Sequence, residues 1–132
     1  MILDSSAVMA IINEEPDAER LLRAAAGAAC RMSVATRLEA SIVADARSAS
    51  HGERLDQVLD ALEIQVEPVS LRQGEVARTA YRRFGRGSGS PARLNFGDCF
   101  AYALSVTSGE PLLFTGDDFT HTDVVAALQS SR

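Results

Sequence analysis

Short apolar segments alternate with longer amphipathic segments along this chain, and the alternation constrains the possible folds more than any other feature. The short segments are residues 2–3, 30–33, 64–69 and 111–115. Short apolar runs are typical of buried strands, whereas apolar residues spaced by three and four are typical of helices. Strands that alternate with helices indicate an α/β fold, with a mainly parallel sheet between helices on both faces.

The amphipathic segments predict helices at 7–13, 16–27, 34–48, 54–62, 72–84 and 95–109, and the length of 132 residues favours one domain over 1–132. In the third helix we expect Leu38, Ile42 and Val43 to face the core. Pro68 places the strand at 64–69 near a sheet edge. The glycine- and serine-rich stretch 85–91 is predicted to be a loop, either simply solvated or mobile beside a substrate groove. Residues 123–128 fit either a strand or a short helix.

All thirteen basic residues are arginine, and the formal net charge is −5. The absence of lysine excludes P-loop NTPases and Schiff-base enzymes. The acidic balance argues against a nucleic-acid binder, but six arginines face one glutamate between residues 72 and 93. Such a basic stretch could steer a phosphodiester toward a metal site.

No segment is apolar enough to cross a membrane or to act as a signal peptide, so we expect a cytoplasmic protein. The two cysteines, Cys30 and Cys99, lie in separate apolar segments. We interpret them as buried reduced thiols, because His51 and His121 lack the spacing that a zinc site would need.

Three acidic residues fall where a parallel sheet would gather them, and a fourth lies within a helix. Asp4 ends the first strand, Asp117 follows the last one, and Asp98 begins the helix that leads into it. Ligands of parallel sheets bind at the carboxyl ends of the strands, near the topological switch point. Glu39 lies within a helix beside apolar residues, where burying an acid is costly without a cation or a donor.

Each of these acids also has a structural explanation. Asp4 could cap a helix, Asp98 could complement a helix dipole, Asp117 or Asp118 could be a turn residue, and Glu39 could be solvated. Those explanations do not account for acids beside apolar strands at one predicted edge. Converging carboxylates attract a hard cation such as Mg²⁺ or Mn²⁺, which can activate water and stabilise a leaving oxygen in phosphodiester cleavage.

Four motifs together resemble the PIN-domain family, and within it the VapC toxins of bacterial toxin–antitoxin pairs. They are ILDSSA, TRLEA, ARLNFGDCFAYAL and LFTGDDF, and the resemblance spans residues 2–123. It implies a PIN-like three-layer α/β/α fold with a parallel sheet of four or five strands. It further implies a Mg²⁺- or Mn²⁺-dependent endoribonuclease that a cognate VapB antitoxin inhibits. We expect an actinobacterial source.

The resemblance also assigns roles to residues. Asp4, Glu39, Asp98 and Asp117 match the catalytic acids. We expect Asp4 and Asp98 to hold the principal cation, with Glu39 and Asp117 completing the pocket through waters or a second ion. Ser6, Asn95 and Thr115 match supporting polar positions, and the adjacent Asp118 is either a second ligand or a helix cap.

The expected partners are the RNA substrate, the VapB-type antitoxin, and either a second copy or a heteromer with the antitoxin. We expect Arg82, Arg83, Arg86 and Arg93 to bind RNA, although Arg93 could instead pair with an active-site acid. The alternative function is a non-catalytic PIN-like module that binds RNA or protein. A small-molecule phosphatase is disfavoured, because DSS after the first strand lacks the required DxD context.

Overall fold

The computed structural model describes residues 1–129 and contains a four-stranded parallel sheet in the order β3-β2-β1-β4. The predicted α/β fold with a parallel sheet is thereby confirmed. Along the chain the elements are β1 (Ile2–Leu3), α1 (Ser5–Ile12), α2 (Ala18–Ala26), β2 (Arg31–Ser33), α3 (Val34–Arg47), α4 (Ala49–Ala61), β3 (Gln65–Glu67), α5 (Leu71–Phe84), α6 (Asp98–Ser108) and β4 (Leu112–Leu113).

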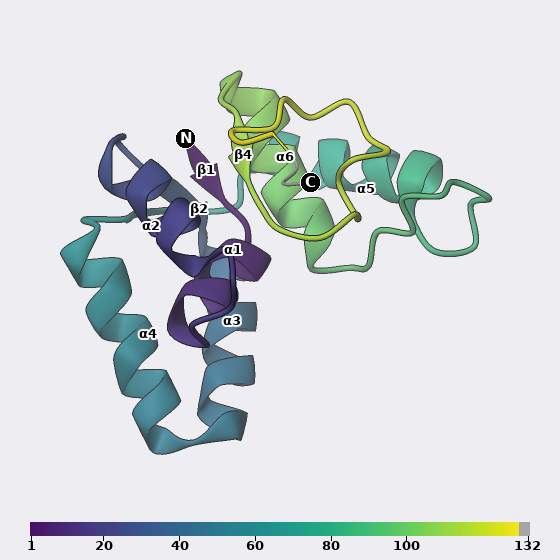
Figure 1. Cartoon of the computed structure of the whole chain (residues 1–132). Coiled ribbons are helices and arrows are strands. Elements are labelled where there is room, and N and C mark those ends of the chain that lie inside the picture. The colour runs from purple at the N-terminus through teal and green to yellow at the C-terminus, as the bar shows by residue number, and fades with distance from the viewer. Residues whose placement is uncertain (130–132) are drawn as a thin grey trace.

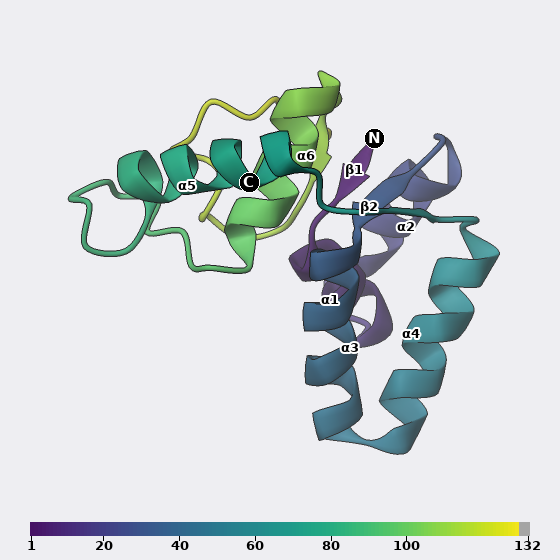
Figure 2. The same cartoon turned by 180° about the vertical axis from the view of Figure 1, so that it is seen from behind.

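Helices cover both faces of the sheet in a three-layer arrangement. Figures 1 and 2 show α1 to α4 on one side of the strands and α5 with α6 on the other. The strands alternate their side chains between the two layers, as extended backbone requires. Leu3 and Leu113 pack with α1 to α4, whereas their neighbours Ile2 and Leu112 pack with α5 and α6.

Polar caps fix where several helices begin and end. The side chains of Asp4, Ser33 and Ser70 accept hydrogen bonds from backbone N–H groups at the starts of α1, α3 and α5. Each cap satisfies a donor that the first helical turn leaves without a partner. Gly109 ends α6 with φ of 68°, a left-handed conformation that glycine adopts without steric cost.

The face of α3 that meets the core differs from the prediction. Leu38, Ile42 and Val43 are 61%, 61% and 49% exposed, whereas Ala40 and Ala44 are fully buried. Because small side chains allow α3 to pack closely against α1 and α4, the alanine side of the helix faces the core. The predicted burial of the three larger side chains was therefore wrong.

Two other expectations at element ends need correction. Residues 123–128 form neither a helix nor a regular strand; one isolated bridge joins Ala126 to Leu112. The fourth helix begins at Ala49 rather than 54, because Ser48 accepts a hydrogen bond from the backbone N–H of His51. The strand β3 does lie at the edge of the sheet, as Pro68 indicated. Within the described residues, no helix has the length and hydropathy to span a membrane.

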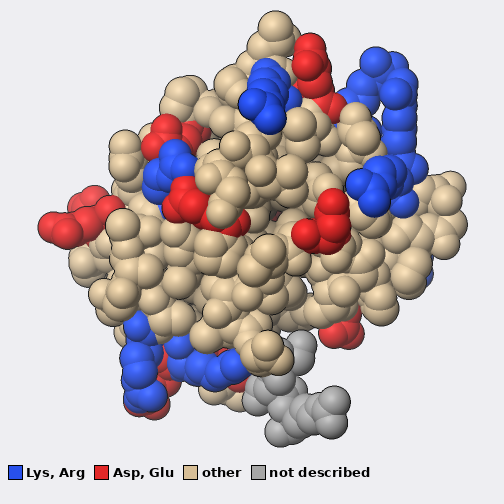
Figure 3. Space-filling view, turned by 90° about the horizontal axis from the view of Figure 1, so that it is seen from above, with Lys and Arg blue, Asp and Glu red and all other residues tan. Residues whose placement is uncertain are grey.

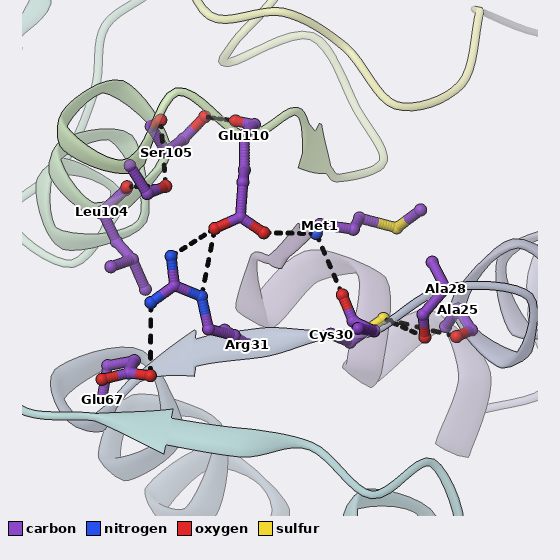
Figure 4. A network of polar contacts seen from close by, with 11 residues as sticks. Met1, Ala25, Ala28, Cys30, Arg31, Glu67, Leu104, Ser105 and Glu110 are labelled. Atoms are coloured by element: carbon purple, nitrogen blue, oxygen red, sulfur yellow. Dashed lines mark hydrogen bonds and ion pairs between the residues drawn. The ribbon is translucent and has the colours of Figure 1, made fainter.

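Figure 4 shows a charged network at the end of the sheet where the chain begins. Arg31 on β2 pairs with Glu67 on β3 at 3.2 Å and with Glu110, which precedes β4. Glu110 also accepts a hydrogen bond from the Met1 ammonium at 2.7 Å. These contacts connect all four strands. Seen from above, acidic and basic side chains are interspersed, and no continuous basic patch covers that face (Figure 3).

We predict that Glu110→Gln lowers the free energy of unfolding by about 1–2 kcal/mol at neutral pH, because it weakens the charge-assisted hydrogen bonds from the Met1 ammonium and the Arg31 guanidinium. Hydrogen bonds from the Met1 ammonium and Arg31 lower the pKa of Glu110 from 4.5 to about 2. This stabilisation is therefore present above the unfolded-state pKa and is lost as the pH falls toward about 2.

Urea unfolding across this pH range measures the difference between the wild type and the variant. The control is Glu19→Gln, which removes an exposed helical pair with Arg23 and should change stability by less than about 0.5 kcal/mol. A difference that stayed constant down to about pH 2 would contradict the electrostatic explanation.

Candidate metal centre

The strand order creates a crevice between two neighbouring strands. The chain runs from β1 outward to β2 and β3, then crosses to place β4 on the other side of β1. The topological switch point therefore lies between β1 and β4, where parallel sheets bind their ligands. Asp4 follows β1 directly and Thr115 follows β4 by two residues, so both lie at this edge.

Asp4 caps α1 and keeps one carboxylate oxygen free. Its Oδ2 accepts a hydrogen bond from the backbone N–H of Ser6 at 3.0 Å. Its Oδ1 is buried and has no hydrogen-bond partner within residues 1–129. A buried oxygen without a donor is costly, so this atom indicates a missing partner. The capping role and a ligand role are thus compatible, because different oxygens serve them.

Asp98, the first residue of α6, is held by a reciprocal pair of hydrogen bonds with Asn95. The backbone N–H of Asn95 donates to Asp98 Oδ2 at 3.0 Å, and the backbone N–H of Asp98 donates to Asn95 Oδ1 at 2.8 Å. Such a box satisfies donors at the start of a helix and fixes the side-chain rotamer. The second oxygen of Asp98 makes no contact in this box and is available to a ligand.

Glu39 reaches the same place from the middle of α3. Its Oε1 accepts a hydrogen bond from Ser5 Oγ at 2.8 Å. Its Oε2 lies so close to Gly97 that a Cβ at that position would stand 1.7 Å from it. Glycine at position 97 is therefore required for the Glu39 carboxylate to approach the start of α6.

These side chains line one open pocket of about 260 Å³. Ser6 connects the ends of β1 and β4, because its Oγ accepts a hydrogen bond from the backbone N–H of Thr115 at 3.1 Å. Residues that line the pocket include Asp4, Ser5, Ser6, Glu39, Asn95, Asp98, Thr115 and Asp118. The structure thus brings together three of the four predicted acids and all three predicted supporting polar residues.

Asp117, the fourth predicted acid, lies elsewhere. It lines a separate pocket of about 150 Å³ with Asp17 and Arg20, while the adjacent Asp118 lines the pocket of the other acids. Gly116 has φ of 89°, and this left-handed turn sets the direction in which the following side chains leave the backbone.

Burial and mutual repulsion make the acids difficult to ionise. Burial is the main cause that raises the pKa of Asp4 to about 6, and the Glu39 charge adds to it against the hydrogen bonds from Ser6. Burial also raises the pKa of Asp98 to about 7, with further contributions from the charges of Asp4, Asp118 and Glu39. A bound cation would reverse this penalty.

The donor set fits a hard divalent cation. It consists of carboxylate oxygens, one of which is buried without a partner within residues 1–129, and no histidine or cysteine lines this pocket in the described part of the chain. Within residues 1–129, no three acidic, histidine or cysteine side chains are close enough together to form a complete metal cage. The carboxylate oxygens that line the pocket are the kind of ligand that Mg²⁺ and Mn²⁺ prefer.

The four arginines predicted to bind RNA are all exposed, and none lines this pocket in the described part of the chain. Arg83 lies 3.7 Å from Asp123 and over the Phe84 ring, so part of its charge is already balanced. Arg93 makes no ion pair with an acid of the pocket among residues 1–129, and it precedes Asn95 by two residues.

Sequence reasoning missed two residues that position the acids, Ser5 and Gly97. Ser5 stood beside Ser6 in the DSS motif, and only helix geometry decides which hydroxyl faces α3. Gly97 precedes Asp98 in the NFGD segment. A glycine just before a predicted helix was a usable signal of close approach by another side chain.

Comparisons with known proteins agree with this arrangement. A model of the PIN-domain family matches residues 1–125. Ribonuclease VapC28 of Mycobacterium tuberculosis is 49% identical over 130 residues, covering 97% of this chain and 98% of that protein. Ribonuclease VapC42 of the same species is 48% identical, with coverages of 94% and 96%.

Solved structures share the fold at low sequence identity. The crystal structure of M. tuberculosis VapC20, a sarcin–ricin-loop-cleaving toxin, has a TM-score of 0.73 at 16% identity and covers 94% of this chain and 95% of that one. A toxin–antitoxin complex from Klebsiella pneumoniae has a TM-score of 0.71 at 14% identity, with 98% of each chain covered.

We predict that, without divalent cations, the free energy of unfolding falls as the pH rises from about 5 to about 8. The folded-state pKa values of Asp4 and Asp98 lie above the usual value of 3.8, so the folded protein binds more protons than the unfolded chain in this window. Each unit of pKa difference corresponds to about 1.4 kcal/mol.

Urea titrations in a chelating buffer measure the fall. Asp98→Asn should reduce it, and added Mg²⁺ or Mn²⁺ should stabilise the wild type more at about pH 8 than at about pH 5, where protons compete for the carboxylates. Equal stability of the metal-free wild type at both ends of the window would refute the prediction.

Proposed function

Because this chain belongs to the PIN-domain family, we propose that the pocket of Asp4, Glu39, Asp98 and Asp118 is the phosphodiester-cleaving site of a VapC-type endoribonuclease. The chain is a ribonuclease of this type, as its relatives at 48–49% identity over nearly their whole length are. The observation that carries the assignment to this pocket is the buried Oδ1 of Asp4, which has no donor in the described structure and lies among three other carboxylates.

Asp4 and Asp98 are the residues we assign to direct metal binding. In both, backbone N–H groups hold Oδ2, and this contact leaves the other oxygen for a ligand. Glu39 and Asp118 complete the pocket through waters or a second ion. When bound, the cation activates a water molecule and stabilises charge on the leaving oxygen. This chain's own residues hold the carboxylates in position, and the contact between Ser6 and Thr115 joins the two segments that follow β1 and β4.

The cation that we propose is Mg²⁺, with Mn²⁺ as the alternative. Divalent metal use is general in the family, and the oxygen-only donor set supports these two ions over zinc. The assignment of Asp118 in place of Asp117 rests on which of the two side chains lines the pocket.

The RNA backbone is proposed to approach over the basic region 72–93. Arg82, Arg86 and Arg93 are exposed there, and Arg83 belongs to the same group although Asp123 balances part of its charge. Exposed arginines contribute affinity that depends on salt, because binding to phosphates releases counterions. The non-catalytic alternative has no support from the relatives, which are named ribonucleases.

The partner that we propose is a cognate VapB-type antitoxin, in a heteromer or together with a second copy of this chain. Two solved structures with this fold are toxin–antitoxin complexes, from K. pneumoniae and, as VapBC2 bound to promoter DNA, from Rickettsia felis. The exposed apolar side chains of α3, Leu38 and Ile42, offer a surface for such a partner.

We predict that Asp4→Asn and Asp98→Asn each lower RNA cleavage in Mg²⁺ or Mn²⁺ by about 100-fold or more, because several kcal/mol of transition-state stabilisation depend on the cation. The adjacent pair Asp118→Asn and Asp117→Asn is a matched comparison. The first should lose about tenfold and the second less than about twofold. Full activity of both Asp4→Asn and Asp98→Asn would sink the assignment of the site.

Gly97→Ala should lower kcat by about 10- to 100-fold, since the added methyl group displaces the Glu39 carboxylate. The backbone at Gly97 has φ of −63°, which alanine adopts freely, so the protein should still fold. The control is Gly27→Ala, where the new Cβ meets its nearest atom at an ordinary 3.5 Å. Cleavage rates and circular dichroism of both variants test the idea, and an active Gly97→Ala would argue against it.

A further inference from the structure

A second cavity lies on the other side of the start of α6, between α5 and α6. Its volume is about 350 Å³, and its lining is almost wholly apolar. Tyr81 comes from α5, while Phe96 and Phe100 come from the start of α6 and the segment before it. Gly74 and Ala77 of α5 leave the space that the aromatic rings surround.

The aromatic rings of this cavity are accessible rather than sealed in the core. Phe96 is 75% exposed and Tyr81 is 41% exposed. Phe96 and Phe100 meet edge to face, with ring centroids 5.0 Å apart, and this contact restrains the orientation of both rings. Flat aromatic faces open to solvent are the surfaces on which unpaired nucleobases stack.

A positively charged side chain, Arg78, lies at the same cavity. Arg78 lines it and, among residues 1–129, forms no ion pair. Its helix also carries Arg72, Arg82 and Arg83 against a single acid, Glu75. An occupant that complements this site is flat and apolar at one end and negatively charged at the other. A nucleotide has both properties, and an aliphatic side chain of a protein partner does not.

Residues that are neighbours in the sequence line this cavity and the metal pocket. Asn95 and Asp98 line the metal pocket, while Phe96 between them and Cys99 after them line this cavity. A nucleotide chain that has one phosphate at the carboxylates can therefore place a neighbouring base across the start of α6.

We propose that the cavity between α5 and α6 binds one unpaired base of the RNA next to the cleaved phosphodiester, with Arg78 contacting the adjoining phosphate. This inference rests on the proposed function of the metal pocket. It makes Tyr81 and Phe96 specificity-determining residues, because only a base that is neither paired nor held in a stack with adjacent bases can enter the cavity. Cleavage is then directed to single-stranded or looped RNA.

The first experiment combines variants of the protein with changes in the substrate. The probe is a short unstructured oligoribonucleotide whose cleavage position is mapped by end labelling, with a single abasic nucleotide scanned through the neighbouring positions. We expect one abasic position to raise the KM of the wild type about tenfold, or about 1.4 kcal/mol. Phe96→Leu and Tyr81→Leu should raise KM similarly on the intact RNA and show no further loss at that abasic position.

A blocking variant separates occupation of the cavity from damage to the fold. A Cβ at Gly74 meets no atom within 4 Å, so Gly74→Leu fills the cavity from a regular helix. Leucine favours the helix more than glycine does, and the variant should be at least as stable as the wild type. It should nevertheless raise the KM for RNA as the aromatic variants do. Arg78→Gln should weaken binding and reduce its salt dependence.

A binding measurement without cleavage distinguishes the two proposals. The chain contains no tryptophan, so Phe96→Trp gives a single indole at the cavity. Intact oligoribonucleotide should quench its fluorescence, and the abasic form should not. If the wild type cleaves no RNA while quenching persists, the proposed function fails and the base site stands.

Two results would overturn the base site. One is unchanged KM for RNA in Phe96→Leu, Tyr81→Leu and Gly74→Leu. The other is a change of oligomeric state or of antitoxin binding in these variants while RNA cleavage stays normal, which would assign the cavity to a protein side chain.

Discussion

Carboxylates that converge at one end of a parallel sheet repel one another. The surrounding structure holds them together with hydrogen bonds to their oxygens. Backbone N–H groups at the starts of α1 and α6 donate to Asp4 and Asp98, and Ser5 donates to Glu39. Burial, with a further contribution from the neighbouring charges, nevertheless keeps the pKa values of Asp4 and Asp98 raised to about 6 and about 7. Under the proposed function, a bound cation would offset this cost, so metal binding and folding stability are coupled.

The sequence was informative wherever one physical rule acted alone. Asp4 follows a buried strand and begins a helix, so strand-end logic placed it correctly. Asp98 followed from the helix that it begins, whereas Asn95, three residues before α6, was expected only from the family resemblance. The strand at the edge followed from Pro68, which cannot donate to a neighbouring strand.

The sequence was less informative where two elements compete for the same space. Along α3 the pattern contained both an alanine side and a leucine and isoleucine side, and only the partners α1 and α4 decided which one turned inward. Similarly, Asp117 and Asp118 are equivalent in a linear pattern, and the left-handed turn at Gly116 separates their directions. Such choices depend on distances in three dimensions, which no spacing in the chain encodes.

The two helical layers contribute different parts of the pocket, and the order of synthesis gives this a consequence. Asp4 and Glu39 belong to the layer made first, whereas Asp98 and Asp118 come from the last third of the chain. β4 completes the crevice after α6, so the pocket does not exist on a nascent chain that has not yet passed residue 118. The two halves of the pocket therefore meet only after residue 118 has been synthesised and β4 has joined the sheet beside β1.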